Sequence, residues 1–301
     1  MSHTQTPVIV LGLGAMGRAL AAAFVKAGVP TTVWNRSAGK DIDLVAAGAV
    51  RAASVAEAIG GDGLVISVLL DHASVHEQLD PVAGRLAGRR WLNLTSTAPE
   101  ESRELAVWAR EHDIEFLDGG IMAVPPMIGE DGSAIFYSGS RSLFDTHRGV
   151  LELLGSAEYF GADAGAAALN DFALLSSMYQ MFVGFFHGAA MAGTGGMSAT
   201  AFAQRAVPFL SAMVQGLPAY GQVIDSGEYA AQIQHLAFQQ AALDAIVRAS
   251  RDAGIATDTL EPIAALVGRQ VEAGHGGLAF ARFIEELRRA PVVATEPEVR
   301  H

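Results

Sequence analysis

Residues 7–17 read PVIVLGLGAMG, and this stretch decides the fold. Its first half, residues 7–12, is a short apolar run that predicts a buried strand, and residues 18–27 have the apolar spacing of a helix. Gly12, Gly14 and Gly17 join the two. In this spacing the first glycine permits a tight turn, the second lets backbone N–H groups approach a pyrophosphate, and the third lets helix and strand pack closely. The stretch therefore predicts a dinucleotide site at the N-terminus of a helix.

Strand-like runs and helical patterns alternate from this unit as far as residue 161. The runs cover residues 31–34, 63–69, 90–94 and 114–118, and residues 134–139 and 157–161 are late candidates for the same sheet. Such alternation places helices on both faces of a parallel sheet, which also accounts for strands that are apolar throughout. We expect an α/β domain with a Rossmann-type, doubly wound sheet.

After residue 161 the apolar residues fall at helical spacing up to about residue 289. Residues 163–193 predict one unusually long helix, and the remainder predicts an all-α domain. We therefore expect a dinucleotide-binding domain over residues 1–161, a long interdomain helix over 162–193, a helical dimerisation and substrate domain over 194–290, and a flexible tail over 291–301.

The long helix raises the question of a membrane span, because residues 172–193 are almost wholly apolar. However, Gln180 and His187 interrupt this stretch, Asp171 precedes it, and no second span follows. A helix buried in protein is the better interpretation. The opening residues, MSHTQTPVIV, lack the basic region of a secretory signal, so we expect a cytoplasmic protein without membrane contact.

Composition excludes several classes of function. The 301 residues include no cysteine, which excludes disulfides, thiolate zinc sites, iron–sulfur clusters and cysteine nucleophiles. With 32 acidic and 20 basic residues the formal charge is −12, so the chain repels phosphate backbones and we expect no nucleic-acid partner. The sequence patterns of serine hydrolases and of P-loop proteins are absent.

Histidines do not indicate a metal site. His72 and His76 lie four residues apart beside Glu77, but no third ligand is apparent, and such pairs also arise on solvated helix faces. We expect no metal. His187 and His235, in the helical half, are interpreted as hydrogen-bonded histidines of the interior or of an interface.

The end of the second expected strand indicates which dinucleotide binds. NAD sites place an acidic residue there, against the 2′-hydroxyl of the adenosine ribose. This chain instead has Trp34, Asn35, Arg36 and Ser37, followed by Lys40. A guanidinium, a hydroxyl and an ammonium group form a clamp for a phosphate, and the guanidinium is also able to stack on adenine. The chain contains only two lysines, which favours a phosphate site over an ordinary basic loop and predicts NADPH.

These features together resemble the β-hydroxyacid dehydrogenase superfamily, and within it the imine reductases and reductive aminases. The resemblance is carried by DGGIMAVPPMIG at residues 118–129, GADAGAAALNDFALLSSMY at 161–179 and GFFHGAA at 184–190. It extends from about residue 7 to residue 289 and includes a helical C-terminal domain like that of 6-phosphogluconate dehydrogenase. It implies NADPH-dependent reduction of C=N bonds, mainly in cyclic imines, and leaves open whether the protein also condenses ketones with amines.

The hydroxyacid members of this superfamily carry a proton-transfer lysine on the long helix, and this chain has no lysine after Lys40. An ammonium group would repel an iminium cation, whereas a carboxylate would stabilise it, so the absence favours the imine-reducing branch. Asp171 supplies a carboxylate, and Leu175 and Tyr179 follow at +4 and +8, on one helical stripe roughly 12 Å long. In reductive aminases an aspartate and a tyrosine eight residues later line the site, and Asp171 and Tyr179 match both.

Other interpretations of Asp171 stay open. The dipole of the helix favours any acidic residue near its N-terminus, and Asn170 is a competing polar candidate that points about 100° away. Burial would raise the pKa of Asp171 and a nearby iminium would lower it. The sequence therefore does not decide whether Asp171 acts as an ionised counter-charge or as a proton donor. Tyr179 is expected to orient the substrate and to join a proton relay.

The motifs and the resemblance together imply which residues contact the cofactor and which contact the substrate. The expected cofactor-binding residues are Gly12, Leu13, Gly14, Met16, Gly17, Asn35, Arg36, Ser37, Lys40, Leu69, Asn93 and Thr95. The expected substrate contacts are Ser96, Met122, Leu175, Phe209, Phe238 and Gln239. Phe238 and Gln239 match a pair that reaches the amine pocket from the partner subunit in relatives, whereas relatives often carry tryptophan in place of Phe209 and asparagine near Ser96. For Phe209 and Phe238, a plain core position is the better interpretation from the sequence alone.

An apolar helix of this length needs more cover than one chain offers. The resemblance implies a homodimer with reciprocally swapped domains, and a small hydrophobic imine or amine as substrate. Two alternatives remain at this point. One is a hydroxyacid or keto reductase of the same superfamily, in which Asp171 or Tyr179 replaces the missing lysine, and the other is a non-catalytic NADPH-binding sensor.

Overall fold

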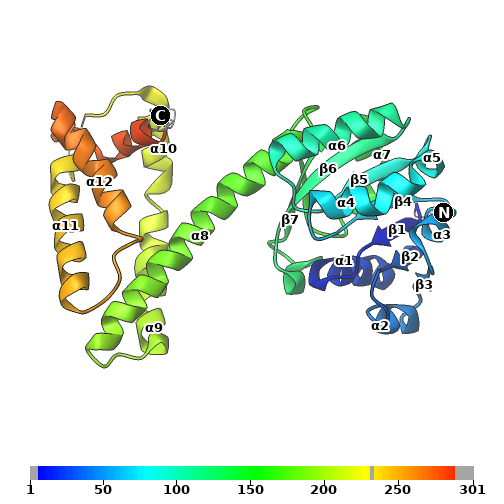
Figure 1. Cartoon of the computed structure of the whole chain (residues 1–301), viewed down its shortest axis with the longest axis horizontal. Helices are drawn as coiled ribbons and strands as arrows, with labels where there is room; N and C mark the ends of the chain where they lie inside the picture. Colours follow the sequence, from blue (N-terminus) through cyan, green and yellow to red (C-terminus); the bar gives the residue numbers. More distant parts are fainter. Residues whose placement is uncertain (1–5, 231–233, 289–301) are drawn as a thin grey trace, which may run out of the picture. The chain divides into compact units, whose positions relative to one another are not determined.

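The computed structural model describes residues 6–230 and 234–288 (Figure 1). The chain forms two compact units, residues 1–177 and 178–301, and their boundary falls within the long helix α8 (Gly165–Thr194). The expected tail, residues 291–301, lies outside the described residues.

The first unit is built on one eight-stranded sheet. Its order is β3-β2-β1-β4-β5-β6-β7-β8. The strands are β1 (Val8–Leu11), β2 (Thr31–Trp34), β3 (Val50–Arg51), β4 (Leu64–Ser67), β5 (Arg90–Asn93), β6 (Glu115–Met122), β7 (Ala134–Gly139) and β8 (Ser156–Tyr159). The helices are α1 (Ala15–Lys26), α2 (Ile42–Ala46), α3 (Val55–Ala58), α4 (His72–Leu79), α5 (Ala83–Leu86), α6 (Pro99–Glu111) and α7 (Arg141–Leu151), with 3₁₀ turns at Asp80–Val82 and Pro125–Met127.

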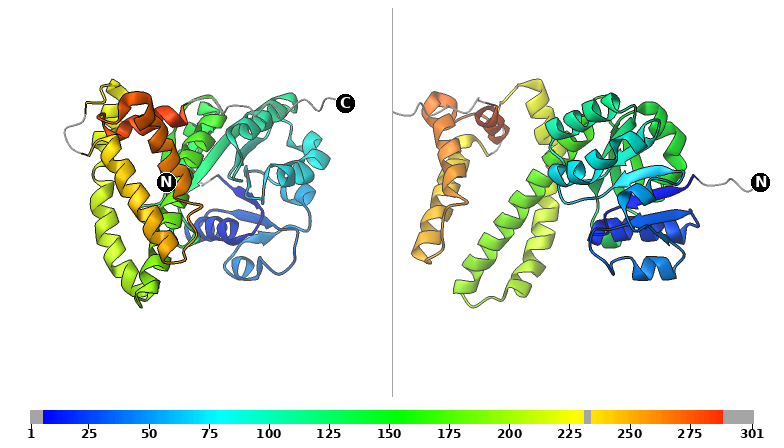
Figure 2. Two further views of the ribbon diagram at one scale, coloured as in Figure 1. Left: turned by 60° about the vertical axis from the view of Figure 1, so that its left-hand side comes forward. Right: turned by 45° about the vertical axis from the view of Figure 1, so that its right-hand side comes forward.

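Both faces of this sheet are buried, because alternate residues of each strand point to opposite sides. Val8 and Val10 of β1 lie in one hydrophobic cluster with α1 and α7, whereas Ile9 and Leu11 lie in a second cluster with α3, α4, α5 and α6. Helices flank the sheet on each face (Figure 2). The predicted doubly wound α/β fold is confirmed.

Three local expectations were incomplete. β3 was missed because its two residues are both exposed and carry no apolar pattern. α1 begins at Ala15 and not at residue 18, so the glycine motif already contains its first turn. β7 runs antiparallel to β6, because the connection between them contains only the 3₁₀ turn at Pro125–Met127, and a parallel crossover needs about a dozen residues, usually a helix.

The second unit is helical. Beyond α8 it contains α9 (Ala199–Val214), α10 (Leu217–Ser226), α11 (Leu236–Asp252), α12 (Glu261–Gln270) and α13 (Ile284–Leu287), with a π-helical turn at Val271–His275 and a 3₁₀ turn at Phe280–Phe283. His187 on α8 is tied to α11, where its Nε2 lies 2.9 Å from Ser250 Oγ. His235 caps α11 by accepting a hydrogen bond from Phe238 N, 3.2 Å away. In the described part of the chain, no helix is long and apolar enough to span a bilayer.

Helix α8 was expected to be buried, and within a single chain it is not. Its buried residues are confined to the first two turns: Gly165, Ala167, Ala168 and Asp171. Further along, large apolar side chains such as Phe182 and Phe186 are exposed. The helix leaves an apolar surface that one copy of the chain does not cover.

Candidate active site

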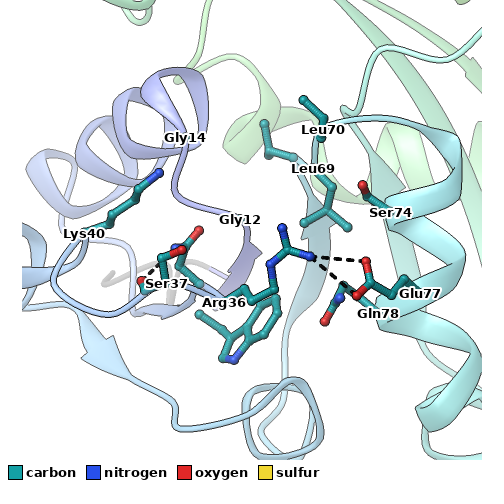
Figure 3. A pocket seen from close by; sticks show the side chains of 13 residues that line it. Gly12, Gly14, Arg36, Ser37, Lys40, Leu69, Leu70, Ser74, Glu77 and Gln78 are labelled. Atoms are coloured by element: carbon teal, nitrogen blue, oxygen red, sulfur yellow. Dashed lines mark hydrogen bonds and ion pairs between the residues drawn. The ribbon is translucent and has the colours of Figure 1, made fainter.

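A pocket of about 310 Å³ lies at the carboxyl ends of β1, β2 and β4 (Figure 3). From β1 the chain first adds strands on one side, β2 and β3, and then on the other, beginning with β4. Ligands of open α/β sheets bind at this reversal of strand order. The lining residues are Gly12, Gly14, Trp34, Asn35, Arg36, Ser37, Lys40, Val68, Leu69, Leu70, Ser74, Glu77 and Gln78.

The three glycines of the motif meet different constraints. Gly12 has φ +103°, and a Cβ there would lie 2.2 Å from Val68 O. A Cβ on Gly17 would lie 2.0 Å from Gly12 O. A Cβ on Gly14, in contrast, would meet no atom within 4 Å. The protein's own packing therefore requires Gly12 and Gly17, whereas Gly14 keeps open space at the start of α1.

That open space suits a pyrophosphate. Gly14 is the N-cap residue of α1, no side chain caps the helix, and its first turn contains no acidic residue. Uncapped N–H groups and the positive end of the helix dipole attract an anion there. Leu13 is fully buried and contributes through its backbone, whose N–H donates to Asn35 Oδ1 at 2.8 Å, and Met16 is half-buried against the core.

The end of β2 presents basic groups to the pocket. Asn35 is fixed by its bonds to Leu13 N and to Ser37 O, the latter 2.8 Å long. Arg36 extends toward α4 and pairs with Glu77 at 3.3 Å (Figure 3). In the described part of the chain, Lys40 forms no ion pair with a carboxylate. Lys40 therefore offers an unneutralised positive charge at the place where a 2′-phosphate is expected, and Ser37 offers a hydroxyl there.

A buried polar network holds the ends of β4, β5 and β6 together. Ser67 Oγ donates to Asn93 Oδ1 at 2.9 Å, and Asn93 Nδ2 donates to Asp118 Oδ1 at 2.8 Å. Thr95 Oγ1 accepts from Leu69 N at 3.0 Å, which anchors the pocket segment after β4. The side chains of Asn93 and Thr95 are thus bonded within the protein, and neither residue lines the pocket. Their contacts with the cofactor stay predictions.

Asp171 lies on α8 and packs against β6. Only 4% of the residue is exposed, and its Oδ1 is buried without a hydrogen-bond partner. A Cβ placed on Gly120 of β6 would lie 2.8 Å from Asp171 Cβ and 3.1 Å from its Oδ2. Burial raises the pKa of Asp171 to about 6. Such a carboxyl exchanges protons close to neutral pH, and its Oδ1 has no hydrogen-bond donor among the described residues.

A second buried carboxyl, Asp118, lies two residues before Gly120 on the same face of β6. Burial raises the pKa of Asp118 to about 7, against the opposing effect of hydrogen bonds from Asn93 and Ser102, and the negative charge of Asp171 raises it further. Asn170, the competing candidate, donates from Nδ2 to Ala166 O at 2.9 Å and so is bonded to its own helix.

The remaining predicted substrate residues fall in both units. Ser96 is exposed after β5, and Met122 and Leu175 are half-buried in the first unit. Tyr179 follows Asp171 on α8 and is 63% exposed. Phe209 on α9 lines an apolar pocket within the second unit, while Phe238 and Gln239 lie in the first turn of α11. The exposure of both phenylalanines excludes a core position within one chain.

The histidine pair lies on α4, where the two rings are 4.8 Å apart. His76 Nδ1 contacts Asp80 at 3.0 Å, and His72 Nε2 lies 3.8 Å from Glu104. Within residues 6–230 and 234–288, no group of three or more histidine, aspartate or glutamate side chains is arranged to hold a metal ion.

Sequence reasoning missed several residues of these sites, which include Val68, Leu70, Ser74, Glu77 and Gln78 at the pocket and Asp118 and Gly120 on β6. Glu77 was noted only as a neighbour of His72 and His76. It lies on α4, which follows β4, the strand next to β1, and in any doubly wound sheet this helix borders the pocket. Asp118 and Gly120 were quoted only as part of a family segment. An acidic residue directly after the apolar pair Phe116 and Leu117, and followed by two glycines, was the available signal.

The fold and these sites define a class. A glycine-rich turn at the strand-order reversal, a basic ribose end and a nearly solvent-free carboxyl are the features of an oxidoreductase that uses a nicotinamide dinucleotide.

Comparisons with known proteins narrow this class. Residues 7–162 match the family described as the NAD binding domain of 6-phosphogluconate dehydrogenase, and residues 163–289 match the family described as the C-terminal domain of NADPH-dependent reductive aminase-like proteins. The NADPH-dependent reductive aminase of Aspergillus oryzae is 39% identical over 93% of this chain and 96% of its own.

Solved structures agree with the sequence matches. A reductive aminase from Aspergillus terreus, solved with NADPH and ethyl levulinate, is 41% identical, with a TM-score of 0.91 over 94% of this chain and 100% of its own. An imine reductase from Streptomyces aurantiacus is 32% identical, with a TM-score of 0.89 over the same shares. The chain belongs to the imine reductase and reductive aminase family of NADPH-dependent oxidoreductases.

The basic residues at the end of β2, where the adenosine ribose is expected, yield a first prediction. Lys40→Ala should weaken binding of NADP⁺ about tenfold or more and leave NAD⁺ binding nearly unchanged, because a charged hydrogen bond to the 2′-phosphate contributes roughly 1.5–3 kcal/mol. Titration calorimetry measures both constants. Lys26→Ala makes the same change of charge outside the pocket and serves as the control. An equal loss for both dinucleotides would contradict the 2′-phosphate assignment.

Proposed function

We propose that this protein reduces C=N bonds of hydrophobic imines and iminium ions to amines with NADPH, and that Asp171 is the side chain that favours the cationic substrate. The observation that carries the proposal is the buried carboxyl of Asp171 with its unpaired Oδ1. Two solved Aspergillus terreus complexes extend the proposed range to ketones with amines and to cyclic imines, because one contains cyclohexanone and allyl amine and another dibenz[c,e]azepine.

Electrostatics supports this reaction over reduction of a keto acid. An unpaired buried carboxyl is costly, and a cation placed against it removes that cost. The protonated imine is the more electrophilic form, so a counter-charge that stabilises it lowers the barrier. The chain has no lysine after Lys40, and α8 contains no lysine or arginine that would repel such a cation.

We assign the cofactor contacts to this chain's own groups. The start of α1 at Gly14 holds the pyrophosphate, and Ser37 and Lys40 hold the 2′-phosphate, with Arg36 beside them. NADPH, when bound, supplies the hydride.

The raised pKa of Asp171 decides its proposed role at each pH. Below about pH 6 the carboxyl holds its proton and is able to donate it to the imine nitrogen. Above that pH it is ionised and acts as a counter-charge, and a bound cation lowers its pKa further. Tyr179 orients the substrate nitrogen, and Ser96 and Gln239 offer further polar contacts. Met122, Leu175, Phe209 and Phe238 form the apolar walls.

We further propose that the active assembly is a homodimer with reciprocally swapped domains. The exposed side chains along α8 and α9 include many large apolar ones, among them Phe182, Phe186, Phe209 and Met213. Exposed apolar surface of this extent is typical of a protein interface, and a second copy of the chain offers the complementary apolar helices.

The role of Asp171 is tested by substitution. Asp171→Ala should lower turnover of a cyclic imine about 10²-fold or more, the scale of a positioned acid–base group. The dissociation constant of NADPH should hardly change, because Asp171 does not line the cofactor pocket. Steady-state oxidation of NADPH and a fluorescence titration measure the two effects. Asn170→Ala, at the neighbouring residue that is bonded to its own helix, is the control. Undiminished turnover of Asp171→Ala would remove this residue from the mechanism.

The assembly is tested by sedimentation equilibrium. At micromolar concentration we expect twice the chain mass of 31.4 kDa. Phe186→Asp places a charge on the exposed face of α8 and should shift the equilibrium toward the single chain. A wild-type protein that sediments as a monomer would rule the dimer out.

A further inference from the structure

A strand glycine next to Asp171 has no backbone reason to be glycine. Gly120 lies in the interior of β6, pairs with Phe136 of β7, and does not have a positive φ. Glycine weakens a strand interior and often marks a place where another group approaches closely. The packing around Gly120 therefore indicates what its missing side chain makes room for.

The space beside Gly120 is filled by one residue. The three nearest atoms to a Cβ placed there all belong to Asp171: Cβ at 2.8 Å, Oδ2 at 3.1 Å and Cγ at 3.2 Å. The closest of them is Asp171 Cβ, whose position is set by the backbone of α8 and not by side-chain rotation. A methyl group on residue 120 would thus displace the start of α8 together with its carboxyl, because rotating the side chain would not relieve the contact.

We propose that Gly120 is a positioning residue for Asp171: its bare backbone lets the carboxyl lie directly on β6, where it is shielded from water and where its Oδ1 meets no protein donor. This inference rests on the proposed function, since it concerns how the proposed counter-charge is held. Gly120 itself supplies no group to the reaction.

The adjacent residue offers a matched control. A Cβ on Gly119 would make an equally short contact, 2.7 Å from Leu94 Cδ2, and would lie 3.1 Å from Phe136 O. Leu94 belongs to the hydrophobic cluster on the opposite face of the sheet from Asp118 and Gly120. Gly119→Ala therefore adds the same methyl group to the same strand without touching Asp171, and rotation of the Leu94 side chain is able to relieve its closest contact.

The test is a double-mutant cycle on the full-length enzyme with a cyclic imine as substrate. Gly120→Ala should lower kcat about tenfold or more, since a displacement of about 1 Å of a reacting group can cost roughly 10²-fold. The dissociation constant of NADPH should stay within about twofold, and Gly119→Ala should lower kcat much less. Introduced into Asp171→Gly, which removes both the carboxyl and the Cβ that the new methyl group meets, the same Gly120→Ala change should have almost no further effect on kcat.

Two results would overturn the inference. One is a Gly120→Ala enzyme with the kcat of the wild type. The other is an equal fold-loss of kcat when Gly120→Ala is introduced into the wild type and into the variant that lacks the Asp171 carboxyl. If Asp171→Ala itself retains turnover, the proposed function fails, whereas a normal Gly120→Ala enzyme beside an inactive Asp171→Ala enzyme refutes only the positioning role.

A stability measurement keeps the test decisive if Gly120→Ala does not fold. Asp171→Gly removes the Cβ that the new methyl group meets. The double variant Gly120→Ala, Asp171→Gly should therefore unfold at a higher temperature than Gly120→Ala alone, although a glycine within a helix is unfavourable by about 1 kcal/mol. No recovery would show that the strain lies elsewhere and would overturn the inference.

Discussion

An unpaired, solvent-free carboxyl is the constraint on which the account of this protein depends. Asp171 is placed by α8 against the bare backbone of Gly120, with Oδ1 unbonded and its pKa raised to about 6. Proteins seldom leave a buried polar oxygen without a partner unless a ligand completes it. We propose that the cation of an imine substrate is this partner, and the chain has no lysine after Lys40 that could take its place.

The same edge of the sheet, formed by the carboxyl ends of its strands, positions both the Asp171 carboxyl and the dinucleotide pocket. The carboxyl ends of β1, β2 and β4 form the cofactor pocket, and a buried network running from Ser67 through Asn93 to Asp118 joins β4, β5 and β6. Thr95 extends the same region to Leu69, which lines the pocket. Rigid strands thus hold the cofactor segment in place, and β6 also supports Asp171, so that neither depends on a mobile loop for its position.

Much of this arrangement was predictable because local patterns carry it. The spacing of Gly12, Gly14 and Gly17 fixes the first turn, and apolar runs fix most strands. The direction of β7 was not predictable in this way, since it depends on the length and content of a connection. Arg36 was predicted to bind phosphate, but its pairing with Glu77 is a contact between residues far apart in sequence. The contact between Asp171 and Gly120 also joins residues far apart in sequence, and only the folded chain brings each pair together. The roles of the individual substrate residues stay predictions.

The most direct test of the central claim is the titration of Asp171 itself, observed by carbon-13 NMR of labelled aspartate carboxyls and assigned by the signal lost in Asp171→Asn. We expect titration at about pH 6, because burial disfavours the charged form, and a downward shift of the pKa when a protonated amine product binds. A carboxyl that titrates near its ordinary value of 3.8, and whose pKa the amine leaves unchanged, would contradict the account.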